Sequence, residues 1–417
     1  MSNTTTSLAS TRIDSVLDAN SFVEIGASIT ARSTDFNLTG IQTPSDGVIT
    51  GYGVIDGNLV YVYSQDVSVL NGTIGEMHAK KIANLYDLAM KTGAPVIGLL
   101  DCAGLRLQEA TDALNAFGEI YRKQALASGV IPQITGIFGI CGVAIFPALT
   151  DFTFMADKGA RLFVNSPNAI EDNYEEKCDT SSALYQSEET GLVDGVGSEE
   201  EILQKIRTLV TMLPSNNEDD ASYEECTDDL NRVCSELVNC AGDTTAQFDG
   251  SLTSKGCRKA AEFIEFCDAF SIPVLTLTNA SGYSAGKCSE KTIAKSVAKL
   301  TYAFAQATVP KVNVIVGKAF GSAYVTMNSK ALGADMVYAW KDAQIGMMDA
   351  NLAAKIMYAD SDMAVIREKA SEYAKLQDSV QSAAARGYVD TIIEPQDTRK
   401  YVIGAFEMLF TKREDRP

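Results

Sequence analysis

"KTGAPVIGLLDCAG" (residues 91–104) and "AFSIPVLTLTNASG" (residues 269–282) are two versions of one segment, and this repeat decides the fold. Each reads as the end of a helix, a proline, a buried apolar strand and a turn of small residues. The prolines of the two versions are separated by the same offset along the chain as their last glycines. Repeats of ~20–50 residues build solenoids, whereas a repeat whose offset is nearly half the chain predicts a duplicated domain.

The same offset relates a second pair of segments, "IPQITGIFG" (131–139) and "VPKVNVIVG" (309–317). Helical stretches lie between such apolar strands, for example at residues 78–91 and 257–270. Strands that alternate with helices indicate an α/β fold with mostly parallel pairing. We therefore predict an α/β protein made of two similar domains.

A polar, acidic stretch with little periodicity separates the two halves and is predicted to be a linker at residues 215–235. The first domain is then expected at residues 20–214 and the second at residues 236–417. Two domains of about 200 residues are the ordinary division of a chain this long. With 46% apolar residues, the chain can bury a core in each of them.

Charge and cysteine content exclude several classes of function. The net charge of −19 argues against nucleic acid or an anionic membrane as the main partner. None of the nine cysteines stands at CxxC spacing, so no metal site is expected, and the chain starts with no apolar leader. A cytoplasmic protein with reduced thiols is expected. Residues 130–149 are uncharged and long enough to span a bilayer, but two prolines and Gln133 interrupt them and favour a buried strand, a turn and a helix.

In each half the second strand runs into a turn of small residues, "GICGVAIFPAL" (139–149) and "GKAFGSAYVTM" (317–327). Each turn leads into an expected helix, whose first N–H groups lack partners inside the helix and lie at its positive end. Such groups can stabilise a developing oxyanion, each donor contributing ~3–4 kcal/mol. The alternative is that small residues only allow close packing of helix on sheet. Both interpretations stay open on the turns alone.

Several further segments point to one family. They are "RIDSVLDANSFVEI" (12–25), residues 45–82, "PALTDFTFMAD" (147–157), "FCDAFSIPV" (266–274), "ATVPKV" (307–312) and "AARGYVDTIIEP" (384–395). Over nearly its whole length the chain resembles the carboxyltransferase subunit of biotin-dependent acyl-CoA carboxylases and decarboxylases, of the propionyl-CoA carboxylase beta or methylmalonyl-CoA decarboxylase alpha type.

The resemblance implies a crotonase-like fold in each half, with the active site at a dimer interface. Acyl-CoA would lie on the first domain of one chain, and biotin, carried on a separate carrier protein, on the second domain of its neighbour. It also implies a homo-oligomer built from dimers, with a hexamer as one candidate. A biotin carboxylase or a membrane decarboxylase subunit is a candidate further partner.

The resemblance places two oxyanion holes on the two turns. The hole for the thioester falls on the backbone N–H groups of Gly142 and Val143, and the hole for biotin on those of Ser322 and Ala323. The expected acyl-CoA contacts are Gly104, Arg106, Cys141, Tyr324 and Val325. The expected biotin-side residues are Gly282, Tyr283 and Gly321. For Arg106, which could meet a CoA phosphate, a surface ion pair with Glu109 is the alternative.

Some features depart from the family pattern. The first turn is shorter and bulkier than usual, Ser322 replaces a usual glycine, and Val325 stands where an acidic residue is common. The hairpin that normally opens the second domain is nearly absent, so this domain is expected to be shortened. The single histidine, His78, lies on an amphipathic helix and is expected to be structural.

The predicted activity is carboxyl transfer between biotin and an acyl-CoA, in either direction. Two other classes remain as alternatives. A non-catalytic scaffold subunit would explain the missing hairpin and altered glycines. A crotonase-type enoyl-CoA hydratase or isomerase would normally need carboxylates beside the oxyanion hole, and neither turn contains Asp or Glu.

Overall fold

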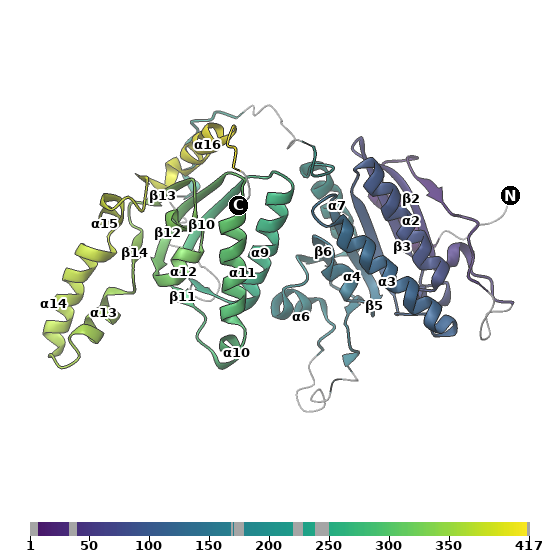
Figure 1. The fold of residues 1–417 in the computed structure, drawn as a ribbon, viewed down its shortest axis with the longest axis horizontal. Helices are drawn as coiled ribbons and strands as arrows, with labels where there is room; N and C mark the ends of the chain where they lie inside the picture. The colour runs from purple at the N-terminus through teal and green to yellow at the C-terminus, as the bar shows by residue number, and fades with distance from the viewer. Residues whose placement is uncertain are drawn as a thin grey trace. The chain divides into compact units, whose positions relative to one another are not determined.

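The computed structural model describes residues 7–32, 40–167, 170, 179–219, 228–237 and 250–414. The chain divides into two compact units, Met1–Ser222 and Tyr223–Pro417. Each unit contains a mostly parallel sheet covered by helices, as the sequence predicts (Figure 1).

The first unit is built on an eight-stranded sheet of order β1-β2-β3-β4-β5-β6-β8, with β7 paired to β5. Its strands are β1 (Val23–Ile25), β2 (Val48–Ile55), β3 (Asn58–Gln65), β4 (Val96–Cys102), β5 (Gln133–Cys141), β6 (Phe152–Ala156), β7 (Arg161–Leu162) and β8 (Gly195–Gly197). Strands β1 to β3 pair antiparallel, and every pairing from β3 onward is parallel.

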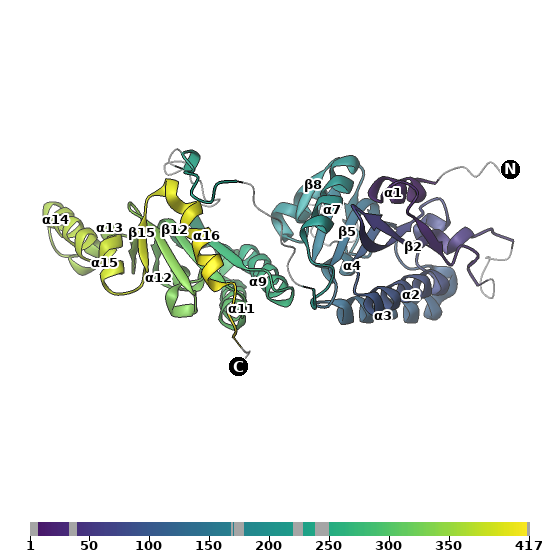
Figure 2. The ribbon, with the colours of Figure 1, turned by 90° about the horizontal axis from the view of Figure 1, so that it is seen from above.

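Helices cover both faces of this sheet. They are α1 (Leu8–Val16), α2 (Glu76–Thr92), α3 (Ala110–Ala127), α4 (Ile145–Ala148), α6 (Ala183–Tyr185) and α7 (Glu199–Met212). Helices α2 and α3 lie side by side on one face, and α1 and α7 lie on the other (Figure 2). Every residue of β4 is buried between these layers, which agrees with an apolar central strand.

The second unit has a smaller sheet of order β10-β12-β13-β15, with β14 paired to β12. Its strands are β10 (Val274–Ala280), β12 (Lys311–Phe320), β13 (Met336–Trp340), β14 (Gln344–Gly346) and β15 (Thr391–Ile393). Strands β9 (Ser251–Leu252) and β11 (Gly282–Tyr283) form a separate two-stranded parallel sheet. Its helices are α9 (Ser254–Ala269), α10 (Lys287–Glu290), α11 (Ile293–Gln306), α12 (Gly321–Thr326), α13 (Ala350–Met357), α14 (Met363–Tyr373), α15 (Val380–Ala385) and α16 (Thr398–Leu409).

The two units repeat each other in their backbone hydrogen bonds. The Val96 N–H donates to the Pro132 carbonyl at 3.0 Å, and the Val274 N–H donates to the Pro310 carbonyl at 2.8 Å. The pairing of β4 with β5 and that of β10 with β12 each shift register just before their last matched residues. All these corresponding positions are related by the offset that relates the repeated segments, so the duplication expected from the sequence is present in the structure.

Glycine at the end of β5 and β12 is required by the side chain of the neighbouring strand. A Cβ on Gly139 would lie 2.1 Å from Asp101 Oδ1, and a Cβ on Gly317 would lie 2.7 Å from Asn279 Oδ1. In the second unit the Asn279 Oδ1 accepts from the backbone N–H of Lys318 at 2.9 Å. The repeated glycines therefore let the end of one strand bond to the side chain of the next.

Strands β1 to β3 of the first unit have no counterpart among the described residues of the second, whose sheet is accordingly shorter. The uncharged stretch at residues 130–149 forms β5, a turn and α4, as predicted. In the described parts of the chain, no helix combines the length and the apolar character needed to cross a bilayer.

Candidate functional site

The second turn presents two unpaired backbone donors. Gly321 follows β12 with φ of +62°, in the left-handed region that glycine adopts without strain. Among the described residues, the amides of Ser322 and Ala323 donate to no backbone carbonyl. The side chain of Ser322 is exposed, and that of Ala323 is buried. These two amides can therefore donate to an oxygen that approaches from outside.

The residues expected beside this turn lie close to it. The hydroxyl of Tyr283 on β11 is 3.2 Å from the Thr326 hydroxyl on α12. A Cβ on the preceding Gly282 would meet no atom within 4 Å, so its backbone is open on that side. Val325 is 42% exposed. Tyr324 is half-buried against the core of the second unit, and burial raises the pKa of its phenol.

The first turn differs from the expectation at Gly142. The Gly142 N–H already donates to the Cys102 carbonyl at 3.0 Å, and a Cβ there would lie 2.6 Å from the Ala103 carbonyl oxygen. The Val143 amide donates to no backbone carbonyl among the described residues. Gly142 is therefore not a free donor, because its N–H joins two strand ends, and its lack of a side chain allows their close approach.

Two further free donors of the first turn follow Val143. The amides of Ala144 and Ile145 donate to no backbone carbonyl within the described ranges. The offset between the matched strand ends of the two units places these two residues at the positions of Ser322 and Ala323. The repeat offset therefore favours Ala144 and Ile145 as the first set of donors, two residues beyond the sequence prediction.

Cys141 and Gly104 differ in what they can contact. The Cys141 side chain is fully buried, and burial raises the pKa of its thiol, so it packs in the core and does not line a substrate site. Gly104 has φ of +132°, and a Cβ on it would meet nothing within 4 Å. The Ile74 N–H donates to the Gly104 carbonyl at 2.9 Å. The backbone of Gly104 is accessible, whereas the expected contact of Cys141 with substrate is wrong.

Arg106 is buried and does not have a free face for a phosphate. Its Nη1 lies 2.5 Å from Asp46 Oδ1 and 2.8 Å from Glu109 Oε1, and all three side chains are at most 2% exposed. Its Nη2 donates to the Thr73 carbonyl at 2.7 Å. The expected CoA contact is therefore wrong. Glu109 is the partner that the alternative named, although the pair lies in the interior and not on the surface.

His78 belongs to the same buried cluster. Its backbone N–H donates to Asp46 Oδ2 at 2.7 Å, and its Nδ1 is 2.9 Å from the Asp46 carbonyl. Its Nε2 faces the Gln65 side chain at 3.3 Å. Burial, assisted by the nearby Arg106 charge, lowers the pKa of His78 to about 3. The imidazole is neutral at physiological pH and structural, as expected.

Asp46 was not identified in the sequence, although it joins both residues. It is fully buried and has φ of +48°. Burial raises the pKa of its carboxyl, and the Arg106 guanidinium opposes that rise. The only local sequence signal for a structural role of Asp46 is its place in a Ser-Asp-Gly turn.

Asp378 is a second residue that the sequence did not reveal. Its carboxylate presses on Gly346, where a Cβ would lie 2.1 Å from Oδ1, and this oxygen has no hydrogen-bond partner among the described residues. Gly346 pairs with Phe320, directly before the second turn. Burial, and then the Asp349 charge, raise the pKa of Asp378 to about 6.

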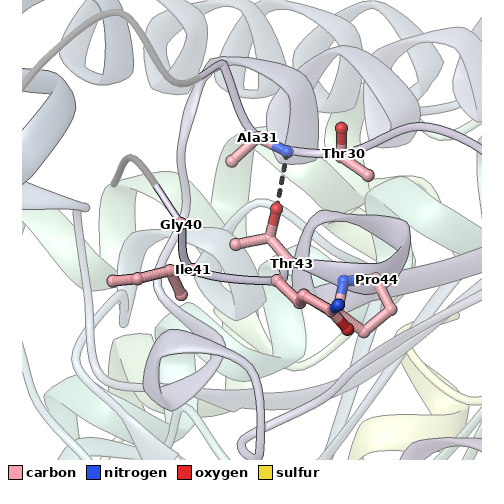
Figure 3. A pocket seen from close by; sticks show the side chains of 7 residues that line it. Thr30, Ala31, Gly40, Ile41, Thr43 and Pro44 are labelled. Atoms are coloured by element: carbon pink, nitrogen blue, oxygen red, sulfur yellow. Dashed lines mark hydrogen bonds between the residues drawn. The ribbon is translucent and has the colours of Figure 1, made fainter. Parts of the chain in front are cut away.

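Two open pockets are lined by residues outside the two turns. One is lined by Thr30, Ala31, Gly40, Ile41, Gln42, Thr43 and Pro44, and the Ala31 N–H donates to the Thr43 hydroxyl at 2.9 Å (Figure 3). None of the described residues that line it has a charged side chain. The other lies between residues 341–351 and 374–381. Within the described ranges, no group of three or more His, Cys, Asp or Glu side chains could hold a metal ion.

Comparison with known proteins agrees with this architecture. Residues 3–249 and 238–417 match the carboxyl transferase domain family. The chain is 39% identical to a putative propionyl-CoA carboxylase beta chain from Bacillus subtilis over 471 residues, which covers 97% of this chain and 91% of that protein. It is 36% identical to methylmalonyl-CoA decarboxylase subunit alpha from Propionigenium modestum over 468 residues, with 97% and 90% covered.

A solved structure supports the same fold. The crystal structure of transcarboxylase 12S, a hexamer with methylmalonyl-coenzyme A bound, superposes with a TM-score of 0.90 at 31% identity and covers 98% of this chain and 91% of that one. The fold is thus the crotonase-like carboxyltransferase fold in two copies. The chain belongs to the carboxyl transferase domain family of enzymes.

Proposed function

We propose that this chain moves a carboxyl group between biotin on a separate carrier protein and an acyl-CoA of the propionyl-CoA and methylmalonyl-CoA class. The observation that carries the proposal is the pair of equivalent donor sets, Ala144 with Ile145 and Ser322 with Ala323. Transfer between a thioester and a cyclic urea needs two oxygens to be polarised, one in each reactant. The names of the relatives support the substrate class.

The donor sets are assigned by unit. In the first unit, the amides of Ala144 and Ile145 donate to the thioester oxygen, which gains negative charge as the carbon beside it becomes nucleophilic. In the second unit, the amides of Ser322 and Ala323 donate to the ureido oxygen of biotin. Biotin, when bound, supplies the carrier for the carboxyl group. Because amides stabilise the same oxyanion in both directions, they serve carboxylation and decarboxylation equally.

The residues present fit these two reactants. The backbones of Gly104 and Gly282 are open beside the respective turns, so a ligand can approach without meeting a side chain there. We propose that Tyr283 lines the second of these sites and that Val325, on the second turn, faces the acyl group. We also propose a homo-oligomer in which donors from neighbouring chains act together, in line with the hexamer of the 12S structure. The free thiols of the described cysteines support a cytosolic setting.

The test replaces Ser322 by proline. Proline removes the unpaired N–H, and the first turn of a helix tolerates it because no helical hydrogen bond is lost. We expect Ser322→Pro to lower kcat for transfer from methylmalonyl-CoA to free biotin by ~10²–10³-fold. The matched Ser322→Ala variant keeps the amide and should retain transfer within a few-fold. Equal activity of the two variants would contradict the assignment.

A scaffold subunit is the second candidate, and the shortened sheet of the second unit favours it. A scaffold would bind neither reactant. Isothermal titration with methylmalonyl-CoA distinguishes the two functions, because the carboxyltransferase must bind it and a scaffold need not. An enoyl-CoA hydratase or isomerase is less favoured, since neither turn carries an acidic side chain.

A further inference from the structure

Two buried polar side chains from the sheet of the second unit reach the end of α12, the short helix that begins at the second turn. Asn313 of β12 and Thr278 of β10 are both 0% exposed. The Thr278 hydroxyl donates to Asn313 Oδ1 at 2.7 Å, and Asn313 Nδ2 donates to the Met327 carbonyl at 3.2 Å. Met327 directly follows the last residue of α12. The sheet is therefore hydrogen-bonded to the end of this helix.

The bonded end of α12 lies close to the proposed donors. The Met327 N–H donates to the Ala323 carbonyl at 3.2 Å, and the Thr326 hydroxyl donates to the Ser322 carbonyl at 2.9 Å. The helix has six residues. Because the first four N–H groups of a helix have no partner inside it, few bonds of its own fix a helix this short. The direction of the Ser322 and Ala323 amides thus depends on how the end of α12 is held.

The residue after Met327 is also bonded to the sheet. Asn328 is 1% exposed and has φ of +50°, and its Nδ2 donates to the Thr276 hydroxyl at 2.8 Å. Thr276 lies two positions before Thr278, on the same face of β10. It is also the residue that pairs with Asn313 across the two strands. The chain that leaves α12 is therefore held by both strands, at two successive residues.

The first unit holds the helix after its own turn with different residues. Gln124 Nε2 donates to the Phe146 carbonyl at 3.3 Å, and the Thr153 hydroxyl donates to the Pro147 carbonyl at 3.2 Å. Neither donor stands at the repeat position of Asn313. Both units thus bond the helix after the turn to buried side chains, although these side chains come from different positions. This agreement favours a requirement of the turns themselves over simple inheritance from the repeat.

We propose that Asn313 is a positioning residue for carboxyl transfer, which fixes α12 through the Met327 carbonyl and so directs the amides of the second turn. Thr278 orients the Asn313 side chain. The inference rests on the proposed function, because that function assigns these amides to the ureido oxygen of biotin. Donors stabilise an oxyanion best when they already point at it, and a misplacement of ~1 Å can cost ~10²-fold in rate. Because Asn313 is fully buried, it acts through the helix and not on a reactant.

Two variants remove this bond in different ways. Asn313→Asp keeps the side-chain shape and the acceptor for Thr278, but places an oxygen against the Met327 carbonyl. The double variant Thr278→Val with Asn313→Leu removes both polar side chains, so no buried side-chain donor is left unpaired. In transfer from methylmalonyl-CoA, we expect each to lower kcat/KM for free biotin by at least ~10-fold. KM for methylmalonyl-CoA should not change, since the first unit binds the thioester in the proposed function.

Thr398→Val is the matched control. Trp340 Nε1 donates to the Thr398 hydroxyl at 2.9 Å, and Thr398 is 7% exposed. The control therefore also removes a buried hydrogen bond from the second unit, but on the face of the sheet opposite α12. Its kcat/KM for biotin should match that of the parent. Amide hydrogen exchange over residues 321–328 should become faster in the two Asn313 variants and stay unchanged in the control.

Equal kcat/KM for biotin in the parent and in both Asn313 variants would overturn the proposal, and so would unchanged exchange over residues 321–328. An equal loss of transfer in Thr398→Val would overturn it as well, because the loss would then follow from reduced stability alone. A parent protein that transfers no carboxyl group, combined with faster exchange in the Asn313 variants, would refute the proposed function and support the anchoring of α12 by Asn313.

Discussion

At the residue scale, the cluster of Arg106, Asp46, Glu109 and His78 shows how a residue can resemble a ligand contact and yet hold the fold together. Two carboxylates and one guanidinium are withdrawn from water here. A buried pair contributes little net stability, but loss of one partner leaves an uncompensated charge inside. Because its guanidinium is buried between these carboxylates, we expect Arg106 to affect stability and not to contact substrate directly.

We expect Arg106→Ala to destabilise the first unit by ~3–5 kcal/mol, because Asp46 and Glu109 lose their cation. Arg122→Ala, an exposed arginine on α3, should change stability by no more than about 0.5 kcal/mol. Urea unfolding measures both. Normal stability of Arg106→Ala combined with weak CoA binding would contradict this expectation and would support a contact between Arg106 and a CoA phosphate.

The pKa of His78 predicts a loss of stability in acid. The folded-state pKa of about 3 lies below the ordinary value of 6.5, so the unfolded chain binds a proton that the folded chain refuses. Stability attributable to His78 is complete above pH 6.5 and is lost as the pH falls toward 3, by about 2 kcal/mol between pH 7 and pH 5. His78→Asn should flatten this part of the profile, measured as unfolding free energy. An unchanged slope would exclude His78 as its source.

At the element scale, helix α7 begins with a reciprocal capping box. The Ser198 hydroxyl accepts from the Glu201 N–H at 3.3 Å, and Glu201 Oε2 accepts from the Ser198 N–H at 2.8 Å. The helix that starts here covers β5 and β6 beneath the first turn. Its start therefore matters to the layer that supports the site.

We expect Ser198→Ala to lower the stability of the first unit by ~1 kcal/mol, because one helix N–H loses its acceptor. Ser198→Asp retains an acceptor at the same place and should stay close to the parent. Thermal unfolding followed by circular dichroism compares the two variants. An alanine variant as stable as the aspartate variant would show that the cap is dispensable.

The strands and the duplication could be predicted because their signals are local. Each buried strand is a short apolar run between a proline and a glycine, and the constant offset between the repeats needs only sequence positions. The burial of Arg106 could not be predicted in this way, because it depends on Asp46, 60 residues away. The first donor pair was also misplaced, because the Gly142 N–H is used by a carbonyl of another strand. Such cross-strand bonds leave no local pattern.

At the scale of the whole molecule, the two units differ in how completely their sheets are covered. Most described core residues of the first unit form one continuous apolar cluster. The described core of the second unit includes separate clusters around β12 and β13, one on each face of its sheet. Strand β10, at the end of that sheet, pairs only with β12 among the described residues. The second unit should therefore be the less stable part of the chain.

We expect the purified chain to unfold in two steps, with the second unit unfolding first. Differential scanning calorimetry should resolve two transitions, and hydrogen exchange should assign the lower one to residues 250–414. Exchange that proceeds at one rate across both units, with a single calorimetric transition, would contradict this order.

The ion pairs of Arg12 carry a consequence for synthesis on the ribosome. Arg12 in α1 lies 3.3 Å from Asp101 and 2.9 Å from Glu199 at the start of α7. The second of these partners is 187 residues further along the chain. At ~5–20 residues per second, the ribosome needs roughly 10–40 s to deliver it after Arg12 has been made. During that interval α1 lacks its ion pair with Glu199. The same interval is the time in which a chaperone can bind this part of the nascent chain.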